Sequence, residues 1–300
     1  MIHKSVLLHE AIDGLDIHEG DTFVDGTLGN GGHTEEVLKR FGDRVTVIGI
    51  DLDADALARS KERLSKQGWN NVKYAQGSFR NIDQILTTLS VVKVDRILLD
   101  IGLSSNQFEE SGRGFSFQKD EPLVMNFKKD LTENDLTAKE ILNTWDEENI
   151  VAILQGYGEE QFAPRIAKAI VRSRQLKSIE TTFELVDIIM SATPKFYHHR
   201  KIHPATKTFQ ALRVTVNDEI GAIKEGARKS FDILNPQGRL AIISFHSLED
   251  RVVKQFFKQM EDDGVGKRVN KKIITPSREE TTENPRSRSA KLRIVEKHAR

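Results

Sequence analysis

The chain has 300 residues, with 45 Lys and Arg balanced by 45 Asp and Glu, and it contains no cysteine. The lack of cysteine excludes disulfides, thiolate nucleophiles and cysteine-ligated zinc, and no apolar run reaches the roughly 20 residues of a membrane span. The N-terminus also lacks the apolar stretch of a signal peptide, so we expect a soluble, cytoplasmic protein with a core domain and a second unit.

The first hundred residues alternate between apolar strands and amphipathic helices. The predicted strands are Thr22–Asp25, Val45–Asp51, Asn71–Gln76 and Val94–Asp100, and the predicted helices are Thr34–Phe41, Ala54–Lys66 and Ile82–Leu89. Strands that are apolar along their length and alternate with helices indicate a doubly wound parallel α/β sheet.

This pattern stops near residue 107 and resumes near residue 214. Between these points apolar residues recur at three- and four-residue spacing, which predicts the helices Ala138–Asn143, Glu147–Tyr157, Glu160–Arg174 and Thr182–Ala192. Beyond them we predict a helix, a strand, a second helix and a closing hairpin, at Glu219–Leu234, Gly238–Phe245, Leu248–Met260, and Lys271–Thr275 with Lys291–Val295. The polar stretch 276–290 is predicted as a loop. We therefore expect a core domain of residues 1–106 and 214–300, interrupted by a helical domain of residues 107–213.

A glycine-rich turn follows the first strand, with glycines at 26, 29, 31 and 32 after Asp25. Glycine permits a positive φ and lets a ligand approach the backbone, and such turns bind nucleotide-like cofactors at the edge of parallel sheets. The spacing is not that of the dinucleotide fingerprint, which argues against an NAD-dependent dehydrogenase. An acidic residue here would repel a pyrophosphate and suits a cationic cofactor such as S-adenosylmethionine. A structural turn without a ligand is the alternative.

Further polar or aromatic residues stand at the ends of later strands, where ligands bind in such sheets. Asp51 ends the second strand and could accept both hydroxyls of a ribose. Phe79 could cover an adenine, or could be a core residue. Asp100 opens a second small-residue turn and could hold the cofactor's ammonium group or polarise a substrate N–H. Ser104 in this turn could contribute an acceptor, or could bond its own backbone. His246 is a candidate base or substrate contact, and the alternative is that Ser247 and Glu249–Asp250 of this segment only cap the next helix. The nine histidines form no convincing metal set, so we predict no metal.

Two segments are locally basic although the net charge is zero. Residues 165–213 contain ten Lys and Arg against three acids, and residues 264–300 contain eleven against four. Separated basic segments are typical of an enzyme that binds a polyanion, although solvated helix faces also carry such charge.

Taken together, the motifs resemble the bacterial small-subunit (16S) ribosomal RNA cytosine-N4 methyltransferases, the H family, over essentially the whole chain. The matching pieces are His3 with Val6–Leu8, Asp25–Thr27 with Gly29 and Gly31–His33, Gly49–Asp51, Leu99–Ser105 with Gln107, Arg113–Phe117, Tyr157–Glu160, His203–Arg213, Ile243–Arg251 and Asn284–Arg293.

The resemblance implies a Rossmann-like methyltransferase fold, S-adenosylmethionine as the methyl donor and a cytidine in the decoding region of 16S ribosomal RNA as the acceptor. The small ribosomal subunit is then the partner, and the helical insertion helps to recognise RNA. The implied cofactor contacts are Gly31, Gly32, His33, Asp51, Phe79, Asp100 and Gln107. We place Asp100, Ser104 and His246 at the reacting centre, and Arg113, Arg213, Arg286, Arg288 and Arg293 against RNA. The oligomeric state stays open, with a homodimer among the alternatives.

The chain departs from the family in one segment. Where the family usually reads Pro-Leu-Asp-Met-Arg-Met-Asp, residues 122–128 read Pro-Leu-Val-Met-Asn-Phe-Lys. Ser5 also replaces a usual proline. The first change puts the substrate contacts in doubt, so two rival functions stay open. One is a methyltransferase acting on another nucleic acid or on a protein, and the other is an RNA-binding ribosome-assembly factor with weakened catalysis.

Overall fold

The computed structural model describes residues 5–101 and 111–299. The chain divides into two compact units. One combines Met1–Gly102 with Ile220–Arg300, and we call it the sheet unit. The other is Leu103–Glu219, which we call the insertion unit.

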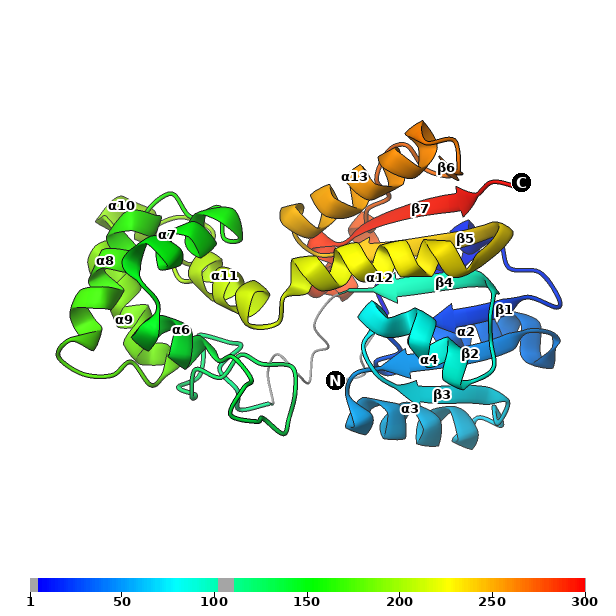
Figure 1. Cartoon of the computed structure of the whole chain (residues 1–300), viewed down its shortest axis with the longest axis horizontal. Coiled ribbons are helices and arrows are strands. Elements are labelled where there is room, and N and C mark those ends of the chain that lie inside the picture. The colour runs from blue at the N-terminus through cyan, green and yellow to red at the C-terminus, as the bar shows by residue number, and fades with distance from the viewer. Residues whose placement is uncertain (1–4, 102–110, 300) are drawn as a thin grey trace. The chain divides into compact units, whose positions relative to one another are not determined.

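A seven-stranded sheet in the order β3-β2-β1-β4-β5-β7-β6 forms the centre of the sheet unit in the described residues (Figure 1). Its first five members run parallel, and β7 runs antiparallel between β5 and β6. The strands are β1 (Thr22–Asp25), β2 (Thr46–Asp51), β3 (Val72–Gln76), β4 (Val94–Asp100), β5 (Leu234–Ser244), β6 (Gly266–Arg268) and β7 (Lys291–Lys297). The strand order reverses between β1 and β4, where the crevice of a doubly wound sheet lies.

Helices cover both faces of this sheet, because successive residues of each strand point to opposite sides. Phe23 and Leu98 share one apolar cluster with α1 (Leu8–Leu15), α2 (Gly32–Phe41) and α3 (Ala54–Lys66). Val24 and Ile97 share the other cluster with helices from later in the chain, namely α4 (Ile82–Thr88), α12 (Glu219–Ile233) and α13 (Ser247–Asp262). The predicted doubly wound α/β fold is thereby confirmed.

The insertion unit has its own helical core. Its described helices are α6 (Ala138–Thr144), α7 (Glu147–Gly156), α8 (Ala163–Arg174), α9 (Thr182–Ala192), α10 (Lys195–His198) and α11 (Thr206–Val216). Ile141, Leu154, Ile166, Ile189 and Leu212 are fully buried in one cluster. The sequence boundary at 213/214 falls inside α11, whereas the structure divides the chain after Glu219.

Several local predictions are wrong at the C-terminal end. The strand Lys291–Lys297 pairs with Gly266–Arg268, and the predicted partner contributes only an isolated bridge between Ile274 and Leu292. The predicted loop 276–290 contains α14 (Arg278–Glu283) and the 3-10 helix η3 (Pro285–Ser289). Capping explains α14, because the Ser277 hydroxyl accepts a hydrogen bond from the Glu280 N–H.

The remaining elements are the short 3-10 helices η1 (Gly42–Arg44) and η2 (Phe79–Asn81). The helices α1, α10 and α11 were not predicted from the sequence. No helix among the described residues is both long enough and apolar enough to cross a membrane.

Candidate active site

The glycine-rich turn after β1 is fixed by hydrogen bonds to its neighbouring strands. The Gly26 N–H donates to the Leu98 carbonyl and the Leu28 N–H to the Ile50 carbonyl, both at 2.9 Å. Gly31 is the N-cap of α2 with φ 73°. Gly29 has φ 52°, and a β-carbon there would stand 3.8 Å from the Thr27 carbonyl oxygen, which is ordinary contact. The positive φ of Gly29 and Gly31 accounts for glycine at these two positions of the turn.

The carbonyls of the same turn are held from α3. The Ser60 hydroxyl donates to the Gly29 carbonyl at 2.6 Å, and Arg63 Nε donates to the Asn30 carbonyl at 3.0 Å. Because these acceptors already have protein donors, the turn keeps its shape without a ligand.

Asp25, at the end of β1, is a buried carboxylate. It is 1 % exposed and accepts hydrogen bonds from the Thr34 hydroxyl and the Thr27 N–H. Desolvation, which outweighs these hydrogen bonds, raises its pKa to about 7, and repulsion from Asp51 adds to the effect. A cation bound close by would lower this pKa and favour the carboxylate.

Asp51, at the end of β2, holds the turn with one oxygen and the start of α3 with the other. It accepts from the Gly29 N–H at 2.7 Å and from the Asp53 N–H at 2.8 Å. Burial raises its pKa as well. A carboxylate oxygen can accept more than one hydrogen bond, so Asp51 retains capacity for ribose hydroxyls. Asp53 is the N-cap of α3, and its side chain accepts a hydrogen bond from the Asp55 N–H.

Asp100 lies at the end of β4, beside the same turn. Its backbone N–H donates to the Thr27 hydroxyl at 2.6 Å. Asp25, Asp51 and Asp100 thus place three carboxyl groups at the ends of neighbouring strands. This group of acidic side chains suits a cationic cofactor and would repel a phosphate. Ser104 and Gln107, predicted as a catalytic residue and a cofactor contact, lie outside the described residues.

The start of α2 is covered by the N-terminal segment. His33 is buried, and its Nε2 lies 3.1 Å from the Val6 carbonyl. A β-carbon on Gly32 would collide with the Ser5 hydroxyl. The backbone N–H of Leu7 in turn donates to the Glu280 carboxylate at 2.8 Å. Part of the predicted cofactor turn is thus held in place by residues from both ends of the chain.

Phe79 is half-buried against the apolar cluster that includes α12. A β-carbon on Gly226 of α12 would stand 2.5 Å from its ring. Both alternatives from the sequence therefore remain, since a half-buried ring can pack in the core and still present an edge or a face to a ligand.

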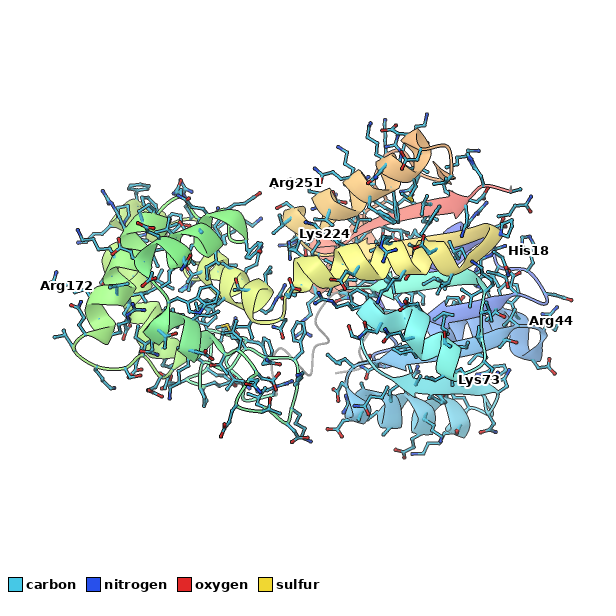
Figure 2. The ribbon with its side chains drawn as sticks, in the orientation of Figure 1. His18, Arg44, Lys73, Arg172, Lys224 and Arg251 are labelled. Atoms are coloured by element: carbon cyan, nitrogen blue, oxygen red, sulfur yellow. The ribbon has the colours of Figure 1, made fainter. Side chains whose placement is uncertain are left out.

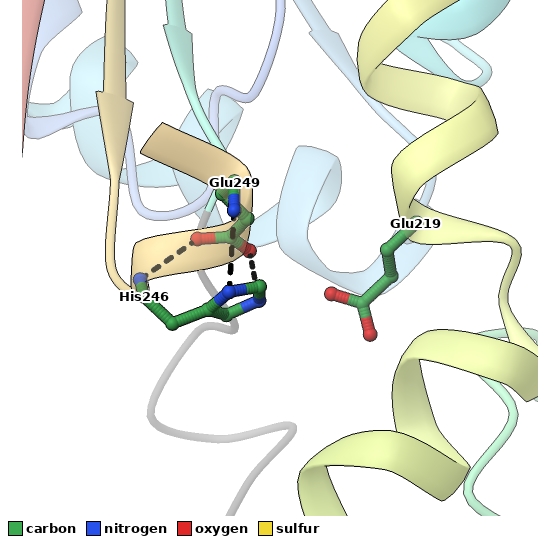
Figure 3. Close-up of side chains that lie close together, drawn as sticks. All are labelled: Glu219, His246 and Glu249. Atoms are coloured by element: carbon green, nitrogen blue, oxygen red, sulfur yellow. Dashed lines mark hydrogen bonds and ion pairs between the residues drawn. The ribbon is translucent and has the colours of Figure 1, made fainter. Parts of the chain in front are cut away.

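His246 is the N-cap of α13 (Figure 3). Its Nδ1 accepts from the Glu249 N–H at 3.3 Å, and its Nε2 lies 3.0 Å from a Glu249 carboxylate oxygen. That carboxylate also accepts from the N–H groups of Phe245 and His246, which makes a capping box. The predicted helix cap is confirmed for Glu249, whereas the N-cap residue is His246 and not Ser247, which is the first residue of the helix. A role for His246 as a base stays a prediction. Glu219, also drawn in Figure 3, accepts two hydrogen bonds from Arg213.

The five arginines predicted to contact RNA differ in their surroundings. Arg293 is 7 % exposed and binds both carboxylate oxygens of Asp250, at 2.7 and 3.1 Å, so the fold accounts for it and its predicted RNA contact has no support. Arg213 is largely buried in its pair with Glu219. Arg286 and Arg288 are exposed.

Arg113, the fifth, contacts the segment that departs from the family. Its Nη1 lies within 3.0 Å of the carbonyl oxygens of Asn126, Phe127 and Lys128, and its guanidinium lies 5.4 Å from the centre of the Phe115 ring. The Asn126 side chain is buried and bonds to the Leu136 carbonyl and the Lys128 N–H. The altered segment is therefore a fully bonded part of the insertion unit.

Sequence reasoning missed the residues that support the site, namely Thr27, Thr34, Ser60 and Arg63. A threonine in the first helical turn after the glycines was a usable signal for Thr34, because its side chain can reach back toward the preceding strand end. Nothing in the sequence distinguishes Ser60 from other serines on a helix.

Comparison with known proteins gives a family for the chain. The model of the MraW methylase family matches residues 1–298. The ribosomal RNA small subunit methyltransferase H of Clostridium botulinum (strain Kyoto / Type A2) is 46 % identical, with 98 % of each chain covered. The protein of the same name from Clostridioides difficile (strain 630) is 42 % identical over the same shares. Among solved structures, an rRNA methylase from Streptococcus thermophilus aligns with 100 % of this chain and 99 % of its own, at 15 % identity and a TM-score of 0.45.

The family match spans the glycine-rich turn and the carboxylates at the ends of β1, β2 and β4. The chain belongs to the MraW methylase family and is an S-adenosylmethionine-dependent methyltransferase.

Proposed function

We propose that the protein methylates N4 of a cytidine in the decoding region of 16S ribosomal RNA, within the small ribosomal subunit. The set of three carboxylates at the carboxyl ends of β1, β2 and β4, beside the glycine-rich turn, carries the proposal, because it suits a cationic methyl donor. The choice of ribosomal RNA as the substrate rests on the names of the relatives. The choice of cytosine N4 as the methylated atom rests on the motif-by-motif resemblance. A ribosomal substrate would place the protein in the cytoplasm.

When bound, S-adenosylmethionine supplies an electrophilic methyl group on its sulfonium sulfur. Gly31, Gly32 and His33 would line its amino-acid end, Asp51 its ribose and Phe79 its adenine, with Gln107 as a further contact. Asp100 would attract a hydrogen of the exocyclic amine, which would help the nitrogen lone pair to leave conjugation with the ring. Holding that nitrogen in line with the methyl group can supply several kcal/mol of the barrier.

The cytosine must leave its stack to reach this crevice. We assign residues 107–213 to RNA recognition, with Arg113 and His246 toward the nucleotide and residues 102–105 beside the reacting centre together with Asp100. Arg286 and Arg288 are exposed and suit contacts to phosphate. The Asn126 side chain is hydrogen bonded within the insertion unit, so the altered segment belongs to the fold of the insertion under both the methyltransferase and the assembly-factor hypotheses.

The test is transfer of labelled methyl groups to small subunits that lack the modification. Label on N4 of a decoding-region cytosine is expected. Label on another position, on DNA or on protein would instead support the rival methyltransferase, and no transfer would support the assembly factor. Asp100→Asn should lose most of its turnover, while Asp55→Asn, an exposed acid in α3, should keep it. Full turnover and unchanged cofactor affinity in Asp100→Asn would refute the role of Asp100.

A further inference from the structure

A group of aromatic rings and arginines lies on the surface of the insertion unit, at the start of α8 and on α10. It consists of Phe162, Arg165, Phe196, Tyr197 and Arg200, and we call it the arginine–aromatic cluster. The Phe162 ring contacts those of Phe196 and Tyr197 edge-on, with centroids 6.1 and 4.9 Å apart. The Arg165 guanidinium lies 5.9 Å from the centre of the Phe162 ring, and that of Arg200 lies 5.1 Å from the centre of the Tyr197 ring.

The cluster is anchored from beneath by one buried carboxylate. Glu160 is 2 % exposed, and it accepts from the Tyr197 hydroxyl at 2.7 Å and from the Phe162 N–H at 2.8 Å. Tyr197 itself is only 5 % exposed. Because Tyr197 and Phe162 are already held in place, little conformational entropy is lost when a ligand stacks on the adjacent Phe196 ring. The cluster is preorganised in this sense.

The outer side of the cluster is apolar and cationic at once. Phe196 is 62 % exposed, and Arg165 and Arg200 are exposed beside it. The sequence from 188 to 217 contains no Asp or Glu, while it holds five Lys and Arg and three His. An ordinary solvated helix face alternates its charges. Arginine and aromatic residues are also common at protein interfaces, but a stretch with Lys and Arg and without any acid favours a polyanion. An exposed ring among guanidinium groups matches the surfaces on which unpaired bases stack.

We propose that the arginine–aromatic cluster binds unpaired nucleotides of the RNA substrate, with a base stacked on Phe196 and phosphates held by Arg165 and Arg200. The identity of the RNA rests on the proposed function, but binding of single-stranded RNA by the cluster does not depend on methyl transfer. The cluster would contribute to affinity for the substrate.

The chain offers a matched control for the exposed ring. Phe183 of α9 is also exposed, at 45 %, and belongs to the insertion unit, but it precedes Glu184 and its N–H bonds to Asp120. We expect Phe196→Ala to weaken binding of a single-stranded RNA oligonucleotide roughly tenfold, as typical for loss of one stacked base, and Phe183→Ala to leave it unchanged. Phe196→Leu should bind as poorly as Phe196→Ala, and Phe196→Trp should bind like the wild type, because stacking needs a π face.

The arginines are tested through the salt dependence of the same binding. Arg165→Gln with Arg200→Gln should reduce the slope of log affinity against log salt by about 1.4, since each phosphate contact on a single strand adds about 0.7. Arg172→Gln serves as the control, because Arg172 is an exposed arginine of α8 that projects from the helix (Figure 2). Thermal unfolding of every variant shows whether the fold is intact.

Wild-type affinity in Phe196→Ala overturns the proposal. So does full RNA affinity in Phe196→Leu, which would show that apolar contact suffices and that no base stacks on the ring, and so does equal loss in Phe183→Ala. Methyl transfer measured in parallel separates the two hypotheses. A cluster-dependent affinity without N4 label overturns the proposed function alone, and N4 label with cluster-independent affinity overturns this inference alone.

Discussion

Replacing Asp25 with Asn should make the protein more stable at neutral and alkaline pH. Asn has the same shape and can keep the contacts to Thr27 and Thr34, but it removes a carboxylate that is buried almost completely. Burial raises the pKa of Asp25 from 3.8 to about 7. This shift of about three units corresponds to about 4 kcal/mol, at about 1.4 kcal/mol per unit.

The sign follows from the raised pKa. The folded state holds the proton more tightly than the unfolded state, so the contribution of Asp25 to stability is fully present below pH 3.8. It is lost as the pH rises to about 7. The free energy of unfolding of Asp25→Asn should therefore exceed that of the wild type by an amount that grows by about 1.4 kcal/mol per pH unit from pH 4 to 7. Above pH 7 the difference should level off at about 4 kcal/mol.

Urea unfolding of both proteins between pH 5 and 8.5 measures this difference, and groups common to both cancel. Thr34→Val should move the upper end of the titration to higher pH, because the Thr34 hydroxyl stabilises the carboxylate. In the wild type, the affinity for the cationic S-adenosylmethionine should increase with pH as Asp25 loses its proton. In Asp25→Asn this increase should be absent. A pH-independent difference between Asp25→Asn and the wild type would refute this account of the buried charge.

Three further changes test other parts of the structure. Arg293→Gln should lower the free energy of unfolding by about 3 kcal/mol, because it breaks the pair with Asp250, and it should leave the salt dependence of RNA binding unchanged. The double variant Arg286→Gln with Arg288→Gln should keep the stability and flatten the salt dependence. A flatter salt dependence in Arg293→Gln would instead show that Arg293 contacts RNA. Asn126→Ala should cost about 1–2 kcal/mol in urea unfolding, because two hydrogen bonds of a buried amide are lost, and an unchanged midpoint would show that the segment tolerates any residue there. Glu280→Ala should weaken binding of S-adenosylhomocysteine several-fold in titration calorimetry, because the variant removes the acceptor of the Leu7 N–H. Glu279→Ala is the control, since Glu279 is exposed, and it should leave the affinity unchanged. Equal affinities of the two variants would show that the Glu280–Leu7 hydrogen bond does not affect cofactor binding.

The parallel half of the sheet could be predicted because both of its faces are buried. Strands such as Thr46–Asp51, which reads Thr-Val-Ile-Gly-Ile-Asp, are then apolar through their centre and end abruptly at a charge, so their ends are visible in the sequence. Asp51 and Asp100 could be predicted as site residues for the same reason, because a charged residue that directly follows a buried strand has left the core.

Other elements were invisible because tertiary contacts decide them. The helix α11 contains five Thr and Val residues of low helix propensity, and it is held by the burial of Phe209 and Leu212. The strand β6 is Gly-Lys-Arg, with no apolar pattern, and only its pairing with β7 defines it. Arg293 could not be told from a phosphate-binding arginine until its contact with Asp250 was known.

The place of β7 in the sheet has a consequence for how the protein is made. This strand, Lys291–Lys297, lies between β5 and β6, and Glu280 shortly before it holds the backbone of Leu7 beside the cofactor turn. While the chain is being translated, the glycine turn and its carboxylates are synthesised early, but their surroundings are completed only when residues near 280–297 have left the ribosome. A nascent or prematurely ended chain therefore has an unfinished methyl-donor site and an unpaired edge on β5, so methyl transfer should be confined to full-length molecules.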